Sequence, residues 1–462
     1  MNKFDWISFA IVISLIIIGL MMIYAAGYQP DSEIPFFSTQ AGRQSIFAIA
    51  TFIILISTQL IDWKFWSGVA YPFYAFTNLL LILVLFLGTT VKGSTSWFQL
   101  GWFNFQPAEL AKMGTIMALA SFLSHHRTRV SDTRDMLIAS GIILLPTTLI
   151  LLQGDAGSAL VFISIFIILF REGLAIWMPV LIFILGLLFV LALKFDVWVV
   201  LPLLLFAGSV FLLSSLKLRQ QHVLVGISVF LISILMTMLN YLNAVIILAS
   251  IFMIYAAVES FRARQTRQVF LLSTGVALLF GFAYLSSYLF ENVLEPHQQD
   301  RINVWLKPEE ADPRGSLYNI LQSKIAIGSG GLSGKGYLEG TMTKLNYVPE
   351  QSTDFIYSII GEEHGFIGSI AVILLFMILM LRVVDIGERA RMPFIRHYAY
   401  GVVGVLFTHI VVNIGMTMGI MPVIGIPLPF ISSGGSSLIG FGLLIGVLLS
   451  MDSSWMRSRR AV

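Results

Sequence analysis

The amino-acid sequence predicts an all-α, polytopic membrane protein, a bundle of about 14 transmembrane helices. Two observations predict this class. Hydrophobic residues make up 57% of the 462 residues, and charged residues only 11%, against roughly a quarter in soluble domains. The chain also holds 36 Phe, more apolar surface than one aqueous core buries. This composition excludes a soluble enzyme, a nucleic-acid-binding protein and a disordered scaffold.

Charge and cysteine content narrow the class further. A net charge of +3 is too small to indicate an anionic polymer as partner, so we expect no nucleic acid. The absence of cysteine excludes disulfides, thiolate catalysis and cysteine-ligated metals.

Apolar stretches long enough to cross a bilayer follow one another along most of the chain, at about 20 residues each. The first, from Trp6 to about Ala26, is longer than the roughly 7–15 residues of a signal-peptide core, so we expect it to remain as a span. The expected spans are residues 5–27, 43–60, 67–88, 107–124, 136–153, 156–170, 174–194, 197–216, 221–239, 243–260, 268–290, 362–382, 397–420 and 435–451. An even number of spans places both termini on one side.

Basic residues orient the bundle, because Lys and Arg in short loops mark the cytoplasmic side. With the termini inside, the basic clusters at 127–134, 217–219, 262–267, 389–396 and 457–460 all face the cytoplasm. Short loops on the other side then hold few basic residues, among them Arg43 and Lys194. The sequence therefore predicts cytoplasmic N- and C-termini.

The polar segments between spans then face outward. The sequence predicts four parts. The N-terminal transmembrane part is 1–194, with an outer loop at 88–107, and residues 195–290 hold additional helices and the span that leads into the large loop. The large extracytoplasmic loop is 291–361, and the C-terminal transmembrane part is 362–462. The Gly328–Gly331 run predicts turns rather than a folded domain in the large loop. A further outer segment, 421–437, is rich in Pro and Gly. Irregular loops on one side of a rigid scaffold are a plausible external site.

Ionisable residues within or beside the spans are the first candidates for function, because charge inside a membrane is costly. Glu109 and Lys112 lie three apart, hence on one helical face, and either serve a site or neutralise each other and hold two helices together. Asp155, beside Gly154, either binds a cation or sugar or caps the helix that follows, and the sequence favours the cap.

Further candidates lie at the expected outer surface. Arg43 and Arg301 are able to contact a phosphate, although Arg43 also fits an arginine that snorkels to the headgroups, and Arg301 needs no explanation in a polar loop. Trp97 and Trp102 at an interface are more often membrane anchors than ligands.

Asp354 precedes the span at 362–382 and should lie at the membrane surface. A carboxylate there is a general base in partly desolvated surroundings or an ordinary helix N-cap, and the residues alone do not choose between the two. No Walker loop, dinucleotide fingerprint, zinc-protease motif or nucleophile elbow occurs in the chain.

Several long motifs resemble the SEDS family (shape, elongation, division and sporulation). They are FQPAELAK at 105–112, QSKIAIGSGG at 322–331, GKG at 334–336, PEQSTDF at 349–355, GIPLPF at 425–430 and SGGS at 433–436. The resemblance covers nearly the whole chain except about 195–290. The residues at 322–331 are more similar to the elongation branch of the family than to the division branch.

The resemblance implies a peptidoglycan glycosyltransferase that polymerises lipid II at the outer face of the bacterial cytoplasmic membrane, for elongation and shape. It implies that Asp354 is the base and that Trp97 is functionally important. The residues that match polar positions lining the family's central cavity are Arg43, Glu109, Lys112, Asp155 and Arg301. Arg43, Lys112 and Arg301 are then candidates for balancing the charge of the leaving undecaprenyl pyrophosphate.

The resemblance also bears on cofactors and partners. A divalent cation is an alternative carrier of positive charge, but no carboxylate cluster specifies a metal site, and no cofactor is certain. The implied partners are a class B penicillin-binding protein and other membrane proteins of the elongation complex. A lipid II flippase and a non-catalytic scaffold for a transpeptidase are the alternatives.

Two departures from the family pattern stand out. Ser433 occupies the position of a tyrosine in the usual Ser-Tyr-Gly-Gly-Ser motif, which puts any role of that phenol in doubt. Residues 174–290 read as five spans where the family usually has one, added to a ten-span core. These four additional helices preserve the sidedness of later spans, and their apolar character indicates a peripheral, lipid-facing or partner-facing position.

The predicted topology has a direct test, because the chain is free of cysteine. We expect a membrane-impermeant maleimide to label Ser333→Cys on intact spheroplasts and to label Ser458→Cys only after lysis. The reverse pattern of labelling would overturn both the orientation and the outward position of Asp354.

Overall fold

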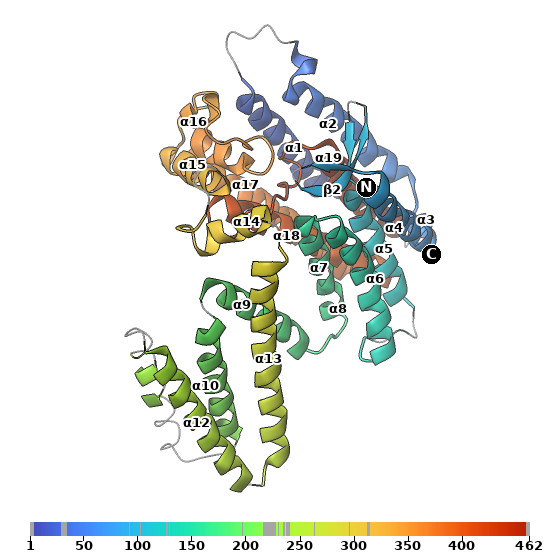
Figure 1. The fold of residues 1–462 in the computed structure, drawn as a ribbon. Helices are drawn as coiled ribbons and strands as arrows, with labels where there is room; N and C mark the ends of the chain where they lie inside the picture. Colours follow the sequence, from blue (N-terminus) through green and yellow to red (C-terminus); the bar gives the residue numbers. More distant parts are fainter. Residues whose placement is uncertain are drawn as a thin grey trace. The chain divides into compact units, whose positions relative to one another are not determined.

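The structure is a computed structural model that describes residues 4–28, 35–91, 93–101, 103–125, 128, 130–195, 197–215, 228–229, 231–233, 236, 241–262, 264–294, 296–311 and 315–458. The chain separates into two compact units. The first combines Met1–Ala175 with Asp312–Val462, and the second is Ile176–Ala311 (Figure 1). The division of the chain predicted from the sequence stays a prediction.

The helices of the first unit alternate with short connections. They are α1 (Trp6–Ala26), α2 (Gln40–Ser57), α3 (Trp63–Gly68), α4 (Ala70–Leu87), α5 (Pro107–Leu123), α6 (Thr133–Leu152), α7 (Ala156–Ile163), α8 (Ile167–Arg171), α15 (Ser316–Ser329), α16 (Thr341–Lys344), α17 (Ile356–Arg389), α18 (Pro393–Thr417) and α19 (Gly435–Ser458). Those of the second unit are α9 (Trp177–Lys194), α10 (Val197–Ser215), α12 (Leu242–Arg262), α13 (Thr266–Asn292) and α14 (Pro296–Leu306).

The predicted class, a polytopic helical bundle, is confirmed. Within the described residues, 10 helices are long and apolar enough to cross a membrane, and 156–171 and 197–213 are shorter apolar helices. All predicted spans coincide with helices except 221–239, and that span lies mostly outside the described residues. The total of 14 spans and their sidedness stay predictions.

The sequence predicts an irregular outer loop at 88–107, and the structure shows instead that this loop is ordered. It forms a three-stranded antiparallel sheet of β1 (Thr89–Val91), β2 (Ser94–Leu100) and β3 (Phe103–Phe105), with Thr89 opposite Trp97 and Gln99 opposite Asn104. The strands are rich in Thr and Phe, residues that favour β structure. Gly93 and Gly101 supply the positive φ angles, 85° and 67°, that the two tight turns require.

The large loop also differs from the expectation of turns. It contains α14, α15 and α16, and α15 continues through Gly328 to Ser329 before the chain turns at Gly331, where φ is 57°. α15 packs against α17 so closely that a Cβ on Gly330 would collide with the carbonyl of Gly361. Burial of an apolar face against α17 therefore outweighs the low helix propensity of glycine in this run.

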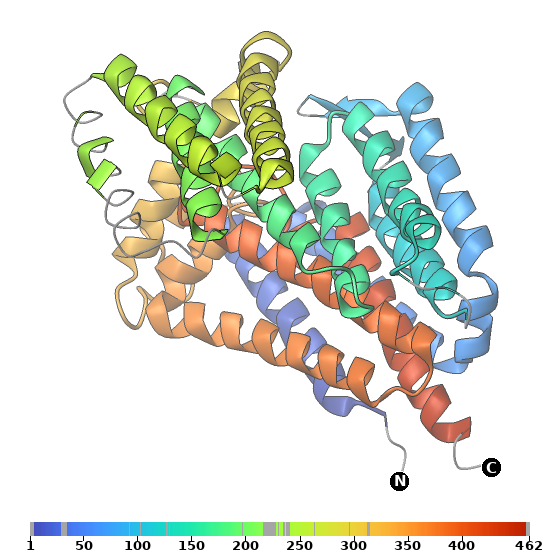
Figure 2. The ribbon, with the colours of Figure 1, turned by 90° about the horizontal axis from the view of Figure 1, so that it is seen from below.

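The most buried helices of the first unit are α5, α18 and α19. Of the residues in the most apolar 18-residue stretch of each helix, 83% are buried in α19 and 61% in α18, but only 28% in α4. α18 packs against α5 and α17, α19 packs against α2, and α1 runs beside α17 (Figure 2). α17 is kinked at Gly365, where φ is 62°.

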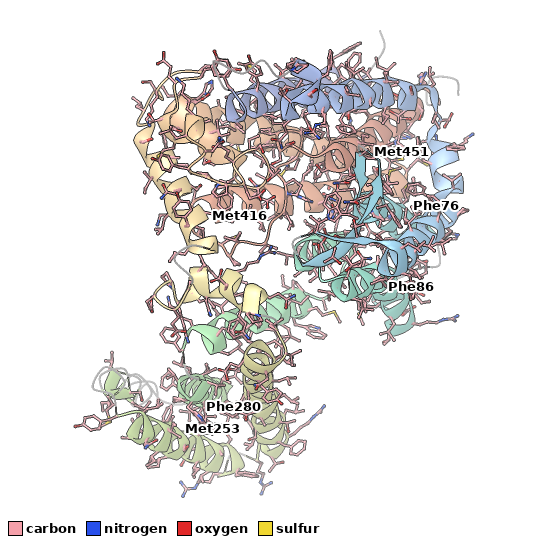
Figure 3. The ribbon with its side chains drawn as sticks, turned by 45° about the horizontal axis from the view of Figure 1, so that its top comes forward. Phe76, Phe86, Met253, Phe280, Met416 and Met451 are labelled. Atoms are coloured by element: carbon pink, nitrogen blue, oxygen red, sulfur yellow. The ribbon has the colours of Figure 1, made fainter. Side chains whose placement is uncertain are left out.

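The outer helices expose large aromatic residues. Phe76 is 51% exposed and Phe86 is 80% exposed on α4, whereas Met416 and Met451 are fully buried (all labelled in Figure 3). A surface of this kind suits lipid rather than water.

The second unit has small apolar cores of its own. α10 packs against α12 and α13, and α13 packs against α9. One core gathers around Leu212, Phe252 and Val269, and another around Leu188, Val200 and Ala283. The peripheral role of the helices predicted here stays a prediction.

Ion pairs join the helices of the first unit at the end where α1 begins and α19 ends. Arg382 of α17 donates to Asp5 at 2.9 Å, and Arg389 of α17 donates to Asp452 of α19 at 2.7 Å. Asp5 also caps α1 by accepting from the Ser8 N–H. Burial alone would raise the pKa of the Asp5 carboxyl, but the hydrogen bonds from Arg382 and Ser8 outweigh it and lower that pKa.

Replacing Asp5 with Asn should therefore destabilise the first unit. A charge-assisted pair in which Arg382 is 29% exposed supports a loss of about 1–2 kcal/mol in the free energy of unfolding. Because the folded-state pKa is lowered, this contribution is present at neutral pH and disappears as the pH falls below about 4. Thermal unfolding in detergent at several pH values measures the difference.

Glu259→Gln is the matched control, since its partner Arg262 is 72% exposed. We expect that variant to lie within about 0.5 kcal/mol of the wild type. An Asp5→Asn effect that did not shrink at low pH would contradict the assignment.

Candidate active site

Asp354 lies in a turn that leads directly into α17. Its own side chain is partly exposed, whereas Phe355 and Ile356 beside it are buried. The N-cap of α17 is Phe355, whose side chain makes no capping hydrogen bond. The structure therefore does not show Asp354 as an N-cap, which was the alternative to a general base.

The Pro/Gly-rich segment between α18 and α19 holds this turn in place. The Ser432 hydroxyl donates to the Thr353 carbonyl at 2.6 Å, and the Ser433 N–H donates to the Ser352 carbonyl at 2.9 Å. Gly425, with φ of 75°, lies so close that a Cβ there would be 3.3 Å from Asp354 Oδ2. Ser433 acts through its backbone, so the turn is held without the phenol that the family pattern has at this position.

α18 supplies two buried side chains that sequence reasoning missed. Asn413 Nδ2 donates to the carbonyls of Asp354, at 2.9 Å, and Ile426, at 2.8 Å. His409, one turn earlier, has Nδ1 2.9 Å from the Pro427 carbonyl. The only available signal was the presence of polar residues inside an otherwise apolar span.

The Glu109–Lys112 pair is formed as the spacing predicts. Lys112 Nζ lies 2.8 Å from Glu109 Oε2, and both side chains are buried. The two charges therefore neutralise each other, but the pair is not isolated, because Nζ also lies 3.1 Å from His409 Nε2 and 4.7 Å from the centre of the Phe441 ring. A role of this pair in binding substrate stays a prediction.

Asp155 caps α7, as the sequence favoured. It accepts from the Ser158 N–H at 2.9 Å and from the Ser158 hydroxyl at 2.8 Å. Gln106 Nε2 also donates to Asp155 at 2.9 Å, and the Gln106 N–H donates to the Ser436 hydroxyl at 3.1 Å. Asp155 is thus linked to the start of α5 and, through Gln106, to the start of α19.

Glu362 organises the segment that precedes Asp354, a role that the sequence did not reveal. Its buried carboxylate accepts from Lys335 Nζ at 2.7 Å, from the Met342 and Thr343 N–H groups at 2.9 Å each, and from the Thr343 hydroxyl at 2.8 Å. Gln351 Nε2 then donates to the carbonyls of Thr343, at 3.0 Å, and Ala26, at 3.1 Å. The segment before Asp354 is therefore attached to both α17 and α1.

The remaining predicted residues are more dispersed. Trp97 lies half-buried in β2, and Arg43 is exposed in the first turn of α2, near Gln44, whose Oε1 accepts from the Gly434 N–H at 3.1 Å. Arg301 belongs to α14 in the second unit. Within the described residues, no group of three or more His, Asp or Glu side chains is placed to hold a metal ion.

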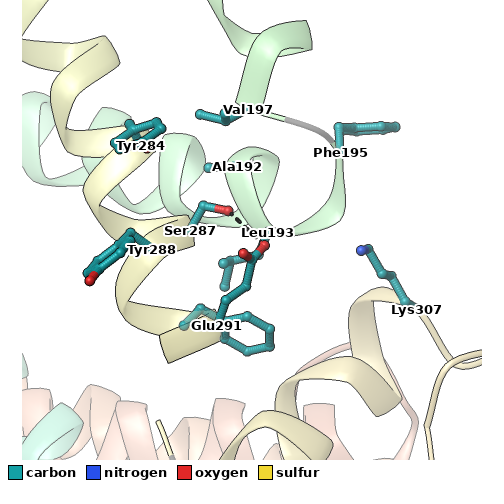
Figure 4. A pocket seen from close by; sticks show the side chains of 10 residues that line it. Ala192, Leu193, Phe195, Val197, Tyr284, Ser287, Tyr288, Glu291 and Lys307 are labelled. Atoms are coloured by element: carbon teal, nitrogen blue, oxygen red, sulfur yellow. Dashed lines mark hydrogen bonds between the residues drawn. The ribbon is translucent and has the colours of Figure 1, made fainter. Parts of the chain in front are cut away.

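A separate cavity of about 420 Å³ lies in the second unit, lined by residues of α9, α10 and α13 and by Lys307, which follows α14. Ser287 donates to Glu291 on its wall, and Lys307 lies opposite (Figure 4). None of the predicted site residues lines it. Apart from Arg301, the polar groups discussed above belong to the first unit.

The fold and site together define a polytopic membrane protein in which irregular segments at one end of a helical bundle hold a partly exposed carboxylate. The chain belongs to the FtsW/RodA/SpoVE family of cell cycle proteins, whose model matches residues 5–203 and 198–456. The resemblance to the SEDS family is therefore confirmed.

Full-length relatives agree with this assignment. The peptidoglycan glycosyltransferase RodA of Treponema pallidum is 32% identical over 454 residues, covering 98% of each chain. The peptidoglycan glycosyltransferase MrdB of Escherichia coli K12 is 29% identical over 442 residues, covering 95% of this chain and 91% of that protein. The expected enzyme class, a glycosyltransferase, is thereby confirmed.

Solved structures show the same fold. A chain of a peptidoglycan synthase complex that coordinates polymerization and crosslinking has a TM-score of 0.64 at 24% identity, with 99% of both chains covered. The rod shape determining protein RodA of Thermus thermophilus has a TM-score of 0.55 at 23% identity, with 97% of this chain and 96% of that chain covered.

The contact between Gly425 and Asp354 yields a prediction. Gly425→Ala should reduce glycan synthesis by about tenfold or more, because the new Cβ meets the Asp354 carboxylate and the left-handed backbone costs about 1–2 kcal/mol. Turnover by the purified protein and its unfolding temperature are measured together.

Gly419→Ala is the matched control, since φ there is 74° but the new Cβ would face Ile320 and Lys324 instead. We expect a similar loss of stability with activity largely retained. Equal losses of activity in both variants would show that backbone strain alone is responsible.

Proposed function

We propose that this protein polymerises lipid II into glycan strands at the outer face of the bacterial cytoplasmic membrane, with Asp354 as the general base. The observation that carries the proposal is the placement of Asp354. Asp354 is a partly exposed residue at the end of an apolar bundle, directly before α17, and lies in a turn held by hydrogen bonds from Asn413, Ser432 and Ser433. The names of the full-length relatives supply the substrate class.

The chemistry is a single displacement. Asp354 takes the proton of the acceptor GlcNAc 4-hydroxyl while that oxygen attacks the anomeric carbon of the donor MurNAc. The bond from the anomeric carbon to the pyrophosphate oxygen breaks, and undecaprenyl pyrophosphate leaves with the electron pair. An α-linkage thereby becomes a β-1,4 linkage, and the proton on Asp354 passes to water.

The leaving pyrophosphate needs positive charge nearby. Lys112 is already paired with Glu109, so the pair as a whole is neutral, and Lys112 would stabilise the pyrophosphate only through the N–H groups of its ammonium. Arg43 is exposed at the start of α2 and is the more available cation of the first unit, while Arg301 remains a candidate from the second. We assign Trp97 and Asp155 to sugar contacts, with a divalent cation as an alternative source of charge.

The same proposal extends to the setting of the enzyme. The lipid tails of donor and acceptor would lie against exposed apolar helices such as α4. The partners we propose are a class B penicillin-binding protein and other membrane proteins of the elongation complex. Support comes from the similar chain in a complex that coordinates polymerization and crosslinking.

Purified protein mixed with lipid II and its transpeptidase partner tests the function directly. Glycan strands indicate a polymerase, leaflet exchange of lipid II without strands indicates a flippase, and neither activity indicates a scaffold. Asp354→Asn should lower the polymerisation rate by about 10²–10⁴-fold, as expected for loss of a general base, with folding and insertion unchanged.

Glu339→Gln is the control for this experiment, because Glu339 is an exposed carboxylate in the same large loop. We expect it to polymerise at the wild-type rate. Near-normal strand synthesis by Asp354→Asn would remove Asp354 from the mechanism.

A further inference from the structure

The imidazole of His409 lies between the buried ion pair and the segment that touches Asp354. The side chain is 2% exposed, with Nε2 3.1 Å from Lys112 Nζ and Nδ1 2.9 Å from the Pro427 carbonyl. An ammonium group only donates and a carbonyl oxygen only accepts. The ring must therefore accept at Nε2 and donate at Nδ1, which makes it a neutral imidazole with its proton on Nδ1.

The orientation of this ring is fixed by its surroundings. The Phe441 ring meets His409 edge-on, with ring centres 4.9 Å apart, and the same Phe441 ring lies 4.7 Å from the Lys112 ammonium. A rotated imidazole would lose both hydrogen bonds at a buried position, which is costly for a polar group. His409 thus makes its two contacts together.

A short path leads from His409 to Asp354. Pro427 follows Ile426, whose carbonyl accepts from Asn413, and Asn413 also donates to the Asp354 carbonyl. Gly425, two residues before Pro427, is the residue that lies against the Asp354 carboxylate. One turn of α18 therefore holds two consecutive carbonyls of this segment and the backbone of Asp354.

We propose that His409 is a positioning residue that couples the Lys112 ammonium to the Asp354 carboxylate through residues 425–428. Lys112 donates an N–H to His409 Nε2, and its ammonium protons also face Glu109 Oε2 in an ion pair at 2.8 Å. A pyrophosphate anion that approaches Lys112 competes with His409 Nε2 for these protons, and the change is passed to Pro427. The response to pyrophosphate and the effect on catalysis rest on the proposed function, whereas the chain of contacts from Lys112 through His409 to residues 425–428 is a property of the folded chain.

Two substitutions separate the two hydrogen bonds. His409→Asn places an amide N–H where Nδ1 was, keeping the bond to Pro427 and losing the acceptor for Lys112. His409→Gln places an amide oxygen where Nε2 was, keeping the acceptor and losing the donor to Pro427. His409→Phe keeps a ring and loses both bonds.

Backbone hydrogen exchange in the purified full-length protein reports whether His409 holds the Pro427 carbonyl, and it requires no enzymatic activity. The N–H groups of Leu428, Ile431 and Ser432 are hydrogen-bonded within the segment. We expect their exchange to accelerate about fivefold in His409→Gln and His409→Phe, as for the loss of one hydrogen bond, and to stay at the wild-type rate in His409→Asn.

Undecaprenyl pyrophosphate is the probe for coupling. It should change the exchange of these N–H groups in the wild type and leave it unchanged in His409→Asn, in which the link to Lys112 is cut. In the polymerisation assay, His409→Gln should lower kcat by about tenfold with little change in KM, since it displaces the base rather than the substrate.

His397→Gln is the matched control, because His397 is a buried histidine on the same helix whose Nε2 lies 3.0 Å from Glu172. It should change neither the exchange nor the response to undecaprenyl pyrophosphate. Unaltered exchange in His409→Phe, or equal acceleration in the Asn and Gln variants, would overturn the proposal. Absence of polymerisation by the wild type would refute the proposed function but leave the exchange result standing.

Discussion

A lysine ammonium buried among apolar helices must find acceptors within the protein, and the arrangement of the site follows from that requirement. An unpaired charge in an apolar core costs several kcal/mol or more. Lys112 meets the requirement with the Glu109 carboxylate and the His409 imidazole, which come from α5 and α18. These two helices, which pack against each other, are thereby joined by polar bonds as well as apolar contacts.

The same constraint explains how an irregular segment persists at the end of the bundle. Non-helical backbone at membrane depth has to be satisfied by the protein itself. The carbonyls of Ile426 and Pro427 accept from α18 side chains, and the Leu428 N–H donates to the Ser432 hydroxyl. Because Pro427 and Pro429 have no N–H, fewer donors in this segment need partners. Proline, serine and glycine are therefore the residues that let an extended segment hold Asp354 in a fixed position.

The large loop is stabilised by a comparable arrangement around Glu362. Four donors converge on its carboxylate, including the backbone N–H groups at the start of α16. A carboxylate that accepts this many hydrogen bonds fixes the backbone around it. The segment from Lys335 to Gln351 is thus held to α17 and α1 before the chain reaches Asp354. The turn that carries the proposed base is consequently supported from both sides, by this segment and by residues 425–433.

Local information determined much of this protein. Hydropathy over windows of about 20 residues is sufficient to locate spans, because each helix must cover the bilayer by itself. The three-residue spacing of Glu109 and Lys112 placed both on one helical face, and the residues around Asp155 indicated a cap, since both features arise within a few residues.

Tertiary structure decided what depends on distant partners. His409 and Lys112 are 297 positions apart, and no local pattern shows that they meet. The helix through Gly328 forms because α17 covers it, and the turn that carries Asp354 is held by hydrogen bonds from α18 and from residues 425–433. Contacts of this kind depend on how helices pack against one another, and the spacing of residues along one helix carries no information about that packing.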